Sequence, residues 1–496
     1  MRERIVIDKN ASKVSSVKVA ISRTHESRYC TLPPFHPSSN YPEYPFKSKD
    51  CLSEEGNRTY EAVRQVLLLL GMDPSNYGQK SWNPLGDLIK PGTRILIKPN
   101  FVYHESHNGI NALVTHSSLI RSLLDYVCIA MDGRGTIVIG DSPIQGADFD
   151  RLVEVSGLSS IVQFFSRLPD LRMEVVDFRT EKVLLNKEGV IVDKLKLPGD
   201  PAGYTTINLR DKSLLKEVEH LAARFRVTMY NKREMFKHHS GSTHEYLIPN
   251  TVFNSDLIIS LPKLKTHRIA GFTGALKSTI GLVGRKDWLP HFCRGSASSG
   301  GDQFNQSSFR KWLIAELSDK IDASDNIVMR KLLTRLRQII HRMRYRFPYK
   351  DPALWGEWYG NDTIWRTILD VFRIIRYTDP SGKLNGTNPK KFLTIVDGII
   401  AGEGEAPLAP TPKKTGWIIG GMEPVAVDLV CTTLMGFDYK KIPQIQNALI
   451  RTDLGLFPWS VDDIQISLWP NDNFSIDHLS DISDRFVAPE GWQGYL

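Results

Sequence analysis

Cysteine is scarce in this chain, and its cysteines lie far apart. Only five occur among 496 residues, and no two of them form a CxxC pair. Zinc ribbons, iron–sulfur clusters and disulfide frameworks need cysteines at close and regular spacing. The sequence therefore predicts none of these, and it predicts thiols that stay reduced.

Long apolar runs are lacking as well. No stretch of about 18 apolar residues without a charge occurs, and the first residues do not have the charge and hydropathy pattern of a secretory signal. The chain has 41% apolar residues, enough for a large core divided over two or three domains. We find no internal repeat and no low-complexity tract. These features predict a soluble, cytoplasmic globular protein.

The positive charge is confined to one segment. The formal net charge is +8, and the segment 329–350 contains eight basic residues and no acid. Apolar residues recur there at helical spacing, which predicts an amphipathic helix with a positive face. A membrane surface or an acidic partner could bind this face, whereas specific nucleic-acid binding is not expected. A solvated helix packed on its own body is the alternative. The basic residues are Arg330, Lys331, Arg335, Arg337, Arg342, Arg344, Arg346 and Lys350.

Apolar periodicity predicts an α/β fold. The segments 94–100 and 136–140 are typical of buried strands, and the segment 117–131 between them is typical of an amphipathic helix. Together they form a βαβ unit, which is parallel and right-handed. Later strands and helices continue the pattern. We expect a mostly parallel, doubly wound core with an antiparallel excursion at 172–209 and a helical insertion.

Four parts of the chain differ in composition. Residues 1–60 are rich in proline and predict an irregular arm. Residues 61–300 hold the α/β core with the main motifs, and residues 301–385 form the basic helical insertion. Residues 386–496 are expected to form a C-terminal α/β part that completes the site.

Polar motifs follow the predicted strands at the points where they end. Because ligands collect at the carboxyl ends of parallel strands, we expect these side chains to converge on a bound molecule. Glycines before Lys277 would let backbone N–H groups approach an anion such as phosphate. The alternatives are ordinary strand caps and a loop that needs positive φ. The expected substrate-binding residues are Lys98, Asn100, Ser142, Lys263, Lys265, Thr266, Gly271 and Gly274.

Carboxylates near the same strand ends suggest a divalent cation. Oxygen ligands suit such ions, and one histidine lies within reach in the sequence. A divalent metal is therefore a candidate cofactor. The expected ligands are Asp397, Glu403, Asp428 and His291.

An ordered set of short motifs resembles a known family. The motifs lie at 97–100, 140–143, 261–267, 277–281, 397–404 and 426–428. In this order they resemble the bacterial and archaeal family called Domain of Unknown Function 362, over roughly 94–435. That family has no assigned activity. Many relatives add a ferredoxin-like module with clustered cysteines, which this chain lacks, so an iron–sulfur cluster is not expected.

A fainter resemblance concerns the segment 256–277. It is similar to the part of the nickel-pincer lactate racemase family that runs from a catalytic histidine to the lysine that tethers the cofactor. The resemblance implies that His267 is a general acid or base and that Lys277 anchors a cofactor or phosphate. His291 or Cys293 would lie near the metal-binding histidine of that family. A second catalytic histidine is replaced by Asp141, so a symmetric two-base racemase is not implied.

Two hypotheses follow. The first is an enzyme that acts on a phosphorylated, nucleotide-like or carboxylated small molecule by metal-assisted proton transfer, with His267, Lys277 and Asp141 as catalytic residues. Two reaction classes are candidates for this enzyme: isomerase-like or epimerase-like chemistry, and redox chemistry. The second is a non-catalytic binding or scaffold protein that docks through the basic helix. Either could be a homo-oligomer, and the sequence identifies neither the substrate nor the metal.

Overall fold

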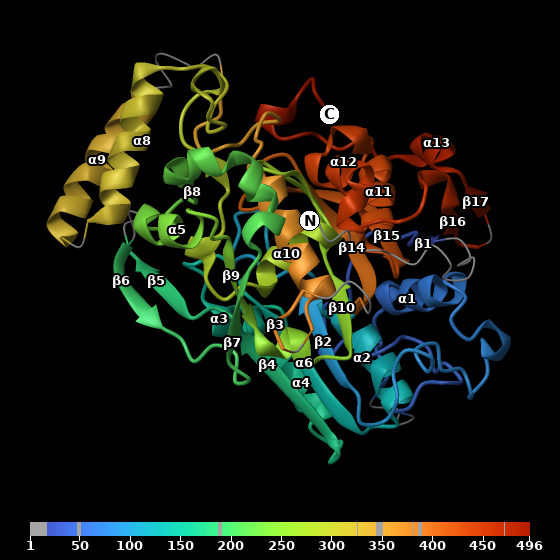
Figure 1. Ribbon diagram of the computed structural model, residues 1–496. Coiled ribbons are helices and arrows are strands. Elements are labelled where there is room, and N and C mark those ends of the chain that lie inside the picture. Colours follow the sequence, from blue (N-terminus) through green and yellow to red (C-terminus); the bar gives the residue numbers. More distant parts are fainter. Residues whose placement is uncertain are drawn as a thin grey trace.

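A large parallel array of strands forms one half of the central sheet (Figure 1). The computed structural model describes residues 17–46, 51–186, 191–324, 326–343, 351–379, 381–384, 389–470 and 472–496. Neighbouring strands of this half are all parallel. The predicted mixed α/β class with a mostly parallel sheet is therefore confirmed. In spatial order the strands are β14 (Lys391–Glu403), β10 (Leu257–Leu261), β2 (Arg94–Pro99), β3 (Gly135–Asp141) and β4 (Leu171–Asp177).

The other half of the sheet is mostly antiparallel. β15 (Thr411–Gly421) returns antiparallel along β14, and β1 (Val17–Arg23) pairs antiparallel with β15. β16 (Ile464–Leu468) and β17 (Asp472–Phe474) complete the edge. We expected residues 17–23 in an irregular arm, but they form an interior strand. Their apolar side chains are buried in the sheet, a signal that the prolines after them obscured.

Both faces of the sheet are covered, which explains its apolar strands. Along β2, Ile95 and Ile97 belong to one buried core and Leu96 belongs to the other, because successive side chains of a strand point to opposite faces. The first core packs under α1 (Arg58–Leu69), α2 (Ser117–Met131) and α4 (Leu158–Phe165). The second packs under α10 (Ile364–Tyr377), α11 (Pro424–Leu434) and α12 (Pro443–Ile450).

The predicted helical insertion divides into two unlike parts. α8 (Phe309–Ala323) and α9 (Ile327–Arg342) pack together as a hairpin at the edge of the molecule (Figure 1). α10 belongs to the core, since every residue from 364 to 376 is buried. Of the predicted basic run, Arg344, Arg346 and Lys350 lie outside the described residues.

The antiparallel excursion is present as two antiparallel strand pairs beside the main sheet. β5 (Glu181–Leu185) pairs with β6 (Ile191–Lys196), and β7 (Tyr204–Asn208) pairs with β9 (Glu245–Pro249). The start of the predicted excursion belongs instead to parallel strand β4. The remaining short elements are α3 (Phe149–Val155), β8 (Phe225–Arg226), α5 (Lys232–His238), α6 (Asn250–Asn254), β11 (Lys263–His267), β12 (Gly271–Thr273), α7 (Ala275–Ser278), β13 (Phe292–Cys293) and α13 (Ile476–Leu479).

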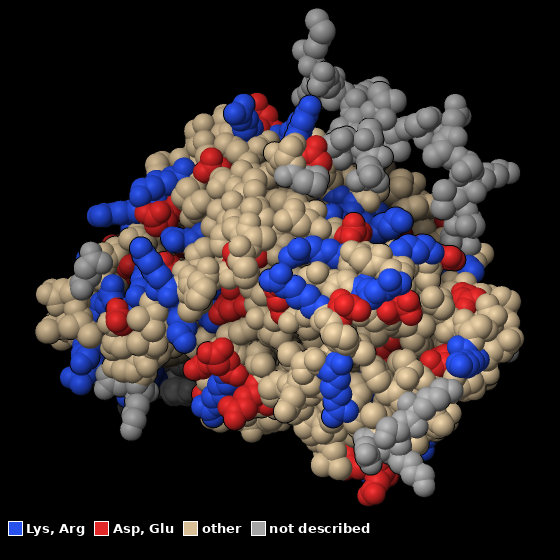
Figure 2. Space-filling model, turned by 90° about the horizontal axis from the view of Figure 1, so that it is seen from below, with Lys and Arg blue, Asp and Glu red and all other residues tan. Residues whose placement is uncertain are grey.

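The surface charge is mixed outside the hairpin. On the face shown in Figure 2, basic and acidic side chains lie interspersed, in keeping with a balanced protein body. Among the described residues, no helix is both long and apolar enough to span a bilayer.

Candidate functional site

A cavity of about 710 Å³ lies where several strands end. Residues at the carboxyl ends of β2 and β3 line it, together with residues of β11 and α7. Four lysines line it, and we call it the lysine cavity. Of the predicted site residues, it brings together Lys98, Asn100, Asp141, Ser142, Lys265, Lys277 and His291.

One of the four lysines is held by a buried ion pair. Lys98 Nζ lies 3.0 Å from Asp141 Oδ1 and donates to the Pro99 carbonyl at 2.7 Å. The Asp141 carboxylate also accepts the backbone N–H groups of Phe101, at 2.6 Å, and Ser142, at 2.7 Å. Burial lowers the pKa of Lys98, and the Asp141 charge opposes that shift. Asp141 therefore serves first as the counter-charge of Lys98 and as a backbone acceptor.

Gly281 lets the chain pass directly over this pair. A Cβ at this position would lie 2.1 Å from Asp141 Oδ1 and 2.6 Å from Lys98 Nζ, closer than atoms can approach. Only glycine fits without moving the pair.

We expect Gly281→Ala to displace the Lys98–Asp141 pair and lower the free energy of unfolding by roughly 1–3 kcal/mol, as overpacking of a filled site does. Urea unfolding measures this change. Gly56→Ala is the matched control, because a Cβ at Gly56 meets nothing within 4 Å. Equal effects of the two substitutions would contradict the close approach.

The other three lysines have no carboxylate partner among the described residues. Lys265 donates to the Leu113 carbonyl at 2.5 Å and Lys286 to the Ile280 carbonyl at 2.8 Å, whereas the Lys277 amine makes no hydrogen bond to the described chain. Burial lowers the pKa of Lys265 well below its usual value, that of Lys277 to about 8 and that of Lys286 to about 7, and neighbouring lysines add to each shift. The lysine cavity is therefore short of negative charge.

Asn100 adds a polar group that is not satisfied. It is 9% exposed and lines the lysine cavity, and its Oδ1 has no hydrogen-bond partner. Leaving a buried polar atom unpaired costs about 1–3 kcal/mol. Asn100 is thus placed to hydrogen-bond a molecule in the cavity.

The hydrogen bonds of two histidines assign them opposite roles. His267 Nδ1 accepts the N–H groups of Ile269 and Ala270 at 3.2 and 3.1 Å, so the neutral ring carries its proton on Nε2 and can only donate there. His291 Nδ1 lies 2.7 Å from the Leu289 carbonyl and must donate to it, which leaves a lone pair on Nε2. Burial lowers the pKa of His267 well below its usual value and that of His291 to about 4. His291 lines the lysine cavity and has the form of a base.

The four predicted metal ligands do not meet. Asp397 pairs with Lys263 at 3.0 Å, and Glu403 pairs with Lys413 at 3.0 Å. Asp428 accepts the first N–H groups of α7, those of Ala275 and Leu276 at 2.5 and 2.9 Å, and burial raises its pKa to about 7. In the described part of the chain, no group of three or more histidine, cysteine or acidic side chains could hold a metal ion. These residues therefore do not fit a metal centre.

Lys263 belongs to a separate buried network. It donates to the Tyr29 hydroxyl at 2.7 Å as well as to Asp397, and Tyr29 donates to Asp397 at 2.5 Å. His116 stacks on the Tyr29 ring, with centroids 4.0 Å apart. These contacts join the N-terminal segment to the strand ends. The Lys263 amine binds protein groups and therefore has a structural role.

The remaining predicted binding residues also have structural partners. The Thr266 hydroxyl donates to the Gly404 carbonyl at 2.8 Å, and that of Ser142 donates to Val283 at 2.8 Å. Gly271 has φ +74° and packs against Trp492, and a Cβ at Gly274 would lie 2.1 Å from Asp428. Of the cavity lining, the sequence analysis missed Lys286, Met229 and Tyr230, which no motif marks.

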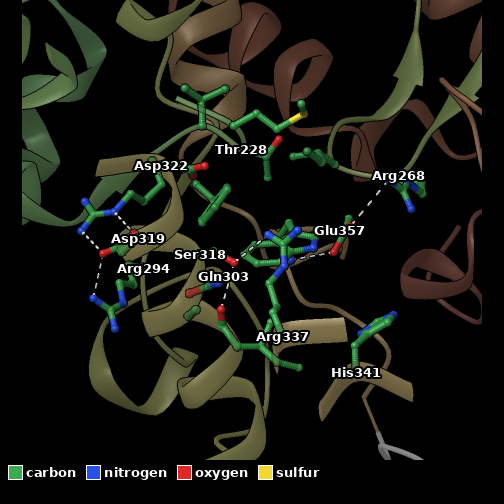
Figure 3. Close-up of a pocket in the computed structure, with 18 of the residues that line it drawn as sticks. Thr228, Arg268, Arg294, Gln303, Ser318, Asp319, Asp322, Arg337, His341 and Glu357 are labelled. Carbon is green, nitrogen blue, oxygen red and sulfur yellow. Dashed lines mark hydrogen bonds and ion pairs between the residues drawn. The ribbon is translucent and has the colours of Figure 1, made fainter. Parts of the chain in front are cut away.

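A second cavity, of about 380 Å³, lies against the α8–α9 hairpin (Figure 3). Four arginines and three carboxylates line it, and Asp319 pairs with Arg226 and Arg294, each at 2.9 Å. Residues 227–229 line both cavities. The basic side chains of the second cavity are thus balanced by carboxylates more closely than those of the lysine cavity, which has four lysines and two carboxylates, Asp141 and Glu105.

Comparisons with known proteins identify a family and little else. No curated protein matches the chain. One similar solved structure is a structural-genomics crystal structure of a Thermotoga maritima protein, with 12% identity and a TM-score of 0.31. The match covers 74% of this chain and 56% of that one, so this chain spans little more than half the length of that protein. We draw nothing about function from so distant a likeness.

A family model matches residues 95–209 and 208–433, which include the lysine cavity's strand ends and α7. Its description is "Domain of unknown function (DUF362)". Because the match covers well over half of the chain, the protein belongs to the DUF362 family.

Proposed function

We propose that the protein is an enzyme whose lysine cavity binds a small molecule with a phosphate or carboxylate group. The observation that carries this proposal is the imbalance of charge: four lysines line the cavity with only two carboxylates. Asp141 is already paired with Lys98, and Glu105 has a side chain that is 58% exposed and lies 3.8 Å from Arg151. Desolvated cations are costly unless they are compensated. A bound anion would supply the missing charge.

The rest of the cavity wall suggests the body of the ligand. A volume of about 710 Å³ is of the size that small-molecule sites have. Apolar and aromatic side chains line the cavity together with the lysines. We therefore expect an anionic head attached to an apolar or aromatic body, as in a nucleotide-like or aryl-bearing compound. These side chains are Phe101, Ile144, Leu185, Met229, Tyr230 and Leu408.

The chemistry that suits this arrangement is proton transfer. Lys277 has a pKa of about 8 and no hydrogen bond within the described chain, so near neutral pH its amine can both take and release a proton. His291 lines the same cavity and keeps a lone pair on Nε2 that can accept a proton or a hydrogen bond. Lys265 and Lys286 would stabilise negative charge that develops on the substrate. We assign these roles in place of the predicted metal-assisted route, and we derive no step through a metal. A cofactor tethered to Lys277 stays a prediction.

Isothermal titration calorimetry with phenyl phosphate tests the proposal, because this probe combines an anionic head with an aromatic body. We expect the wild type to bind it and Lys277→Gln to bind about tenfold more weakly, the effect of one charge-assisted contact. Lys80→Gln removes the same charge from an exposed lysine and should not change the affinity. Equal affinities of the three proteins, or no binding by the wild type, would count against the proposal.

A further inference from the structure

The α8–α9 hairpin exposes an apolar stripe that nothing in the described chain covers. On α9 and the residue after it, Val328, Leu332, Leu336, Ile339 and Met343 are 71%, 61%, 44%, 60% and 43% exposed. They follow one another at intervals of three or four residues, so they lie on one face of the helix. A contiguous exposed apolar surface of this kind marks an interaction site.

Basic side chains border this stripe. Lys331, Arg335 and Arg342 are exposed, and helical geometry places all three along the same edge of it. The sequence of α9 contains no acid. The helix therefore presents an apolar face with a positive margin.

The neighbouring helix adds exposed aromatic rings. Phe309 and Trp312, in the first turns of α8, are 75% and 50% exposed, and their rings stack with centroids 5.8 Å apart. Tryptophan and other amphipathic aromatics favour the boundary between water and lipid. Because α8 and α9 form a hairpin (Figure 1), the first turns of α8 lie toward the C-terminal end of α9.

We propose that the α8–α9 hairpin docks the protein onto the surface of a membrane that contains anionic lipids. The apolar stripe enters the headgroup region, and Lys331, Arg335 and Arg342 contact lipid phosphates. A second copy of the chain fits less well, because a symmetric contact would bring two identical positive margins together. Nucleic acid would use the charge but not the five apolar side chains.

The second cavity lies on the side of α9 away from the stripe, because its α9 lining residues are about half a helical turn from the exposed apolar residues. α9 lines the second cavity through Arg337, Gln338 and His341 (Figure 3), and residues 227–229 separate that cavity from the lysine cavity. The docking proposal does not depend on the proposed function, because it rests on different residues.

Vesicle co-sedimentation tests the docking of the full chain. The wild type should bind phosphatidylcholine vesicles that contain phosphatidylglycerol, and bind pure phosphatidylcholine vesicles far more weakly. Leu332→Ser with Ile339→Ser should weaken binding about tenfold or more, by removing apolar surface. Lys331→Gln with Arg342→Gln should weaken it by roughly fivefold for each charge, an effect that salt reduces. Ile450→Ser, at a residue 66% exposed on α12, is the matched control and should bind like the wild type.

Three results would overturn the docking proposal. The first is no binding of the wild type to either kind of vesicle, and the second is binding that neither double variant weakens. The third is a wild-type dimer, seen by light scattering, that the Leu332→Ser and Ile339→Ser variant dissolves, since the stripe would then pair two copies. Unchanged melting temperatures of all variants, expected for exposed positions, show that each effect is local.

Discussion

Replacing Lys98 by methionine is expected to lower the free energy of unfolding by about 3–5 kcal/mol, the cost of leaving a buried charge without its partner. Asp141 would keep its two backbone donors but lose the ammonium 3.0 Å away. Chemical denaturation measures the change. Lys391→Met, at an exposed position on β14, is the matched control and should alter the stability little.

A double-mutant cycle separates the pair from its surroundings. If Lys98 and Asp141 stabilise each other, Lys98→Met combined with Asp141→Asn should cost clearly less than the sum of the two single substitutions. If Lys98 instead serves only to bind ligand, its removal should relieve the repulsion from nearby lysines and stabilise the free protein. That outcome would show that the ion pair is not structural.

Anion binding by the lysine cavity should weaken steeply as the pH rises. The pKa values of Lys277 and Lys286, about 8 and about 7, mean that both amines lose their protons between pH 6 and pH 9 in the empty cavity. A bound anion favours the protonated amines and raises both pKa values. If it raises each by about one unit, the affinity should fall on the order of fiftyfold over this range.

Sulfate is the probe for this pH dependence, because its own charge stays constant over the range. Titration calorimetry in buffers of different ionisation enthalpy should show proton uptake on binding near pH 8, since the bound lysines hold more protons than the free ones. An affinity that does not change between pH 6 and pH 9 would contradict the assignment of Lys277 and Lys286 to the anion site.

The strand ends were predictable because they follow from local pattern. The apolar runs before Lys98, Asp141 and Lys265 mark parallel strands, and the carboxyl ends of such strands meet at one edge. The structure places all three residues on one cavity. The mixed α/β class followed from the same periodicity.

The partners of the buried charges were not predictable, because they come from distant parts of the chain. Tyr29 and Asp397 are 368 positions apart, and no local signal at Lys263 shows that both contact it. Asp428 resembles a metal ligand in sequence, yet it caps α7 across 152 positions. Which of His267 and His291 can act as a base depends on backbone contacts that only the fold creates.

Anomalous diffraction from crystals soaked in selenate, an analogue of sulfate, tests most directly whether the lysine cavity is an anion site. We predict a selenium peak within contact distance of the ammonium groups of Lys265, Lys277 and Lys286, and its loss in crystals of Lys277→Gln. Selenium peaks only on the outer surface, with none among these three lysines, would contradict an anion-binding function.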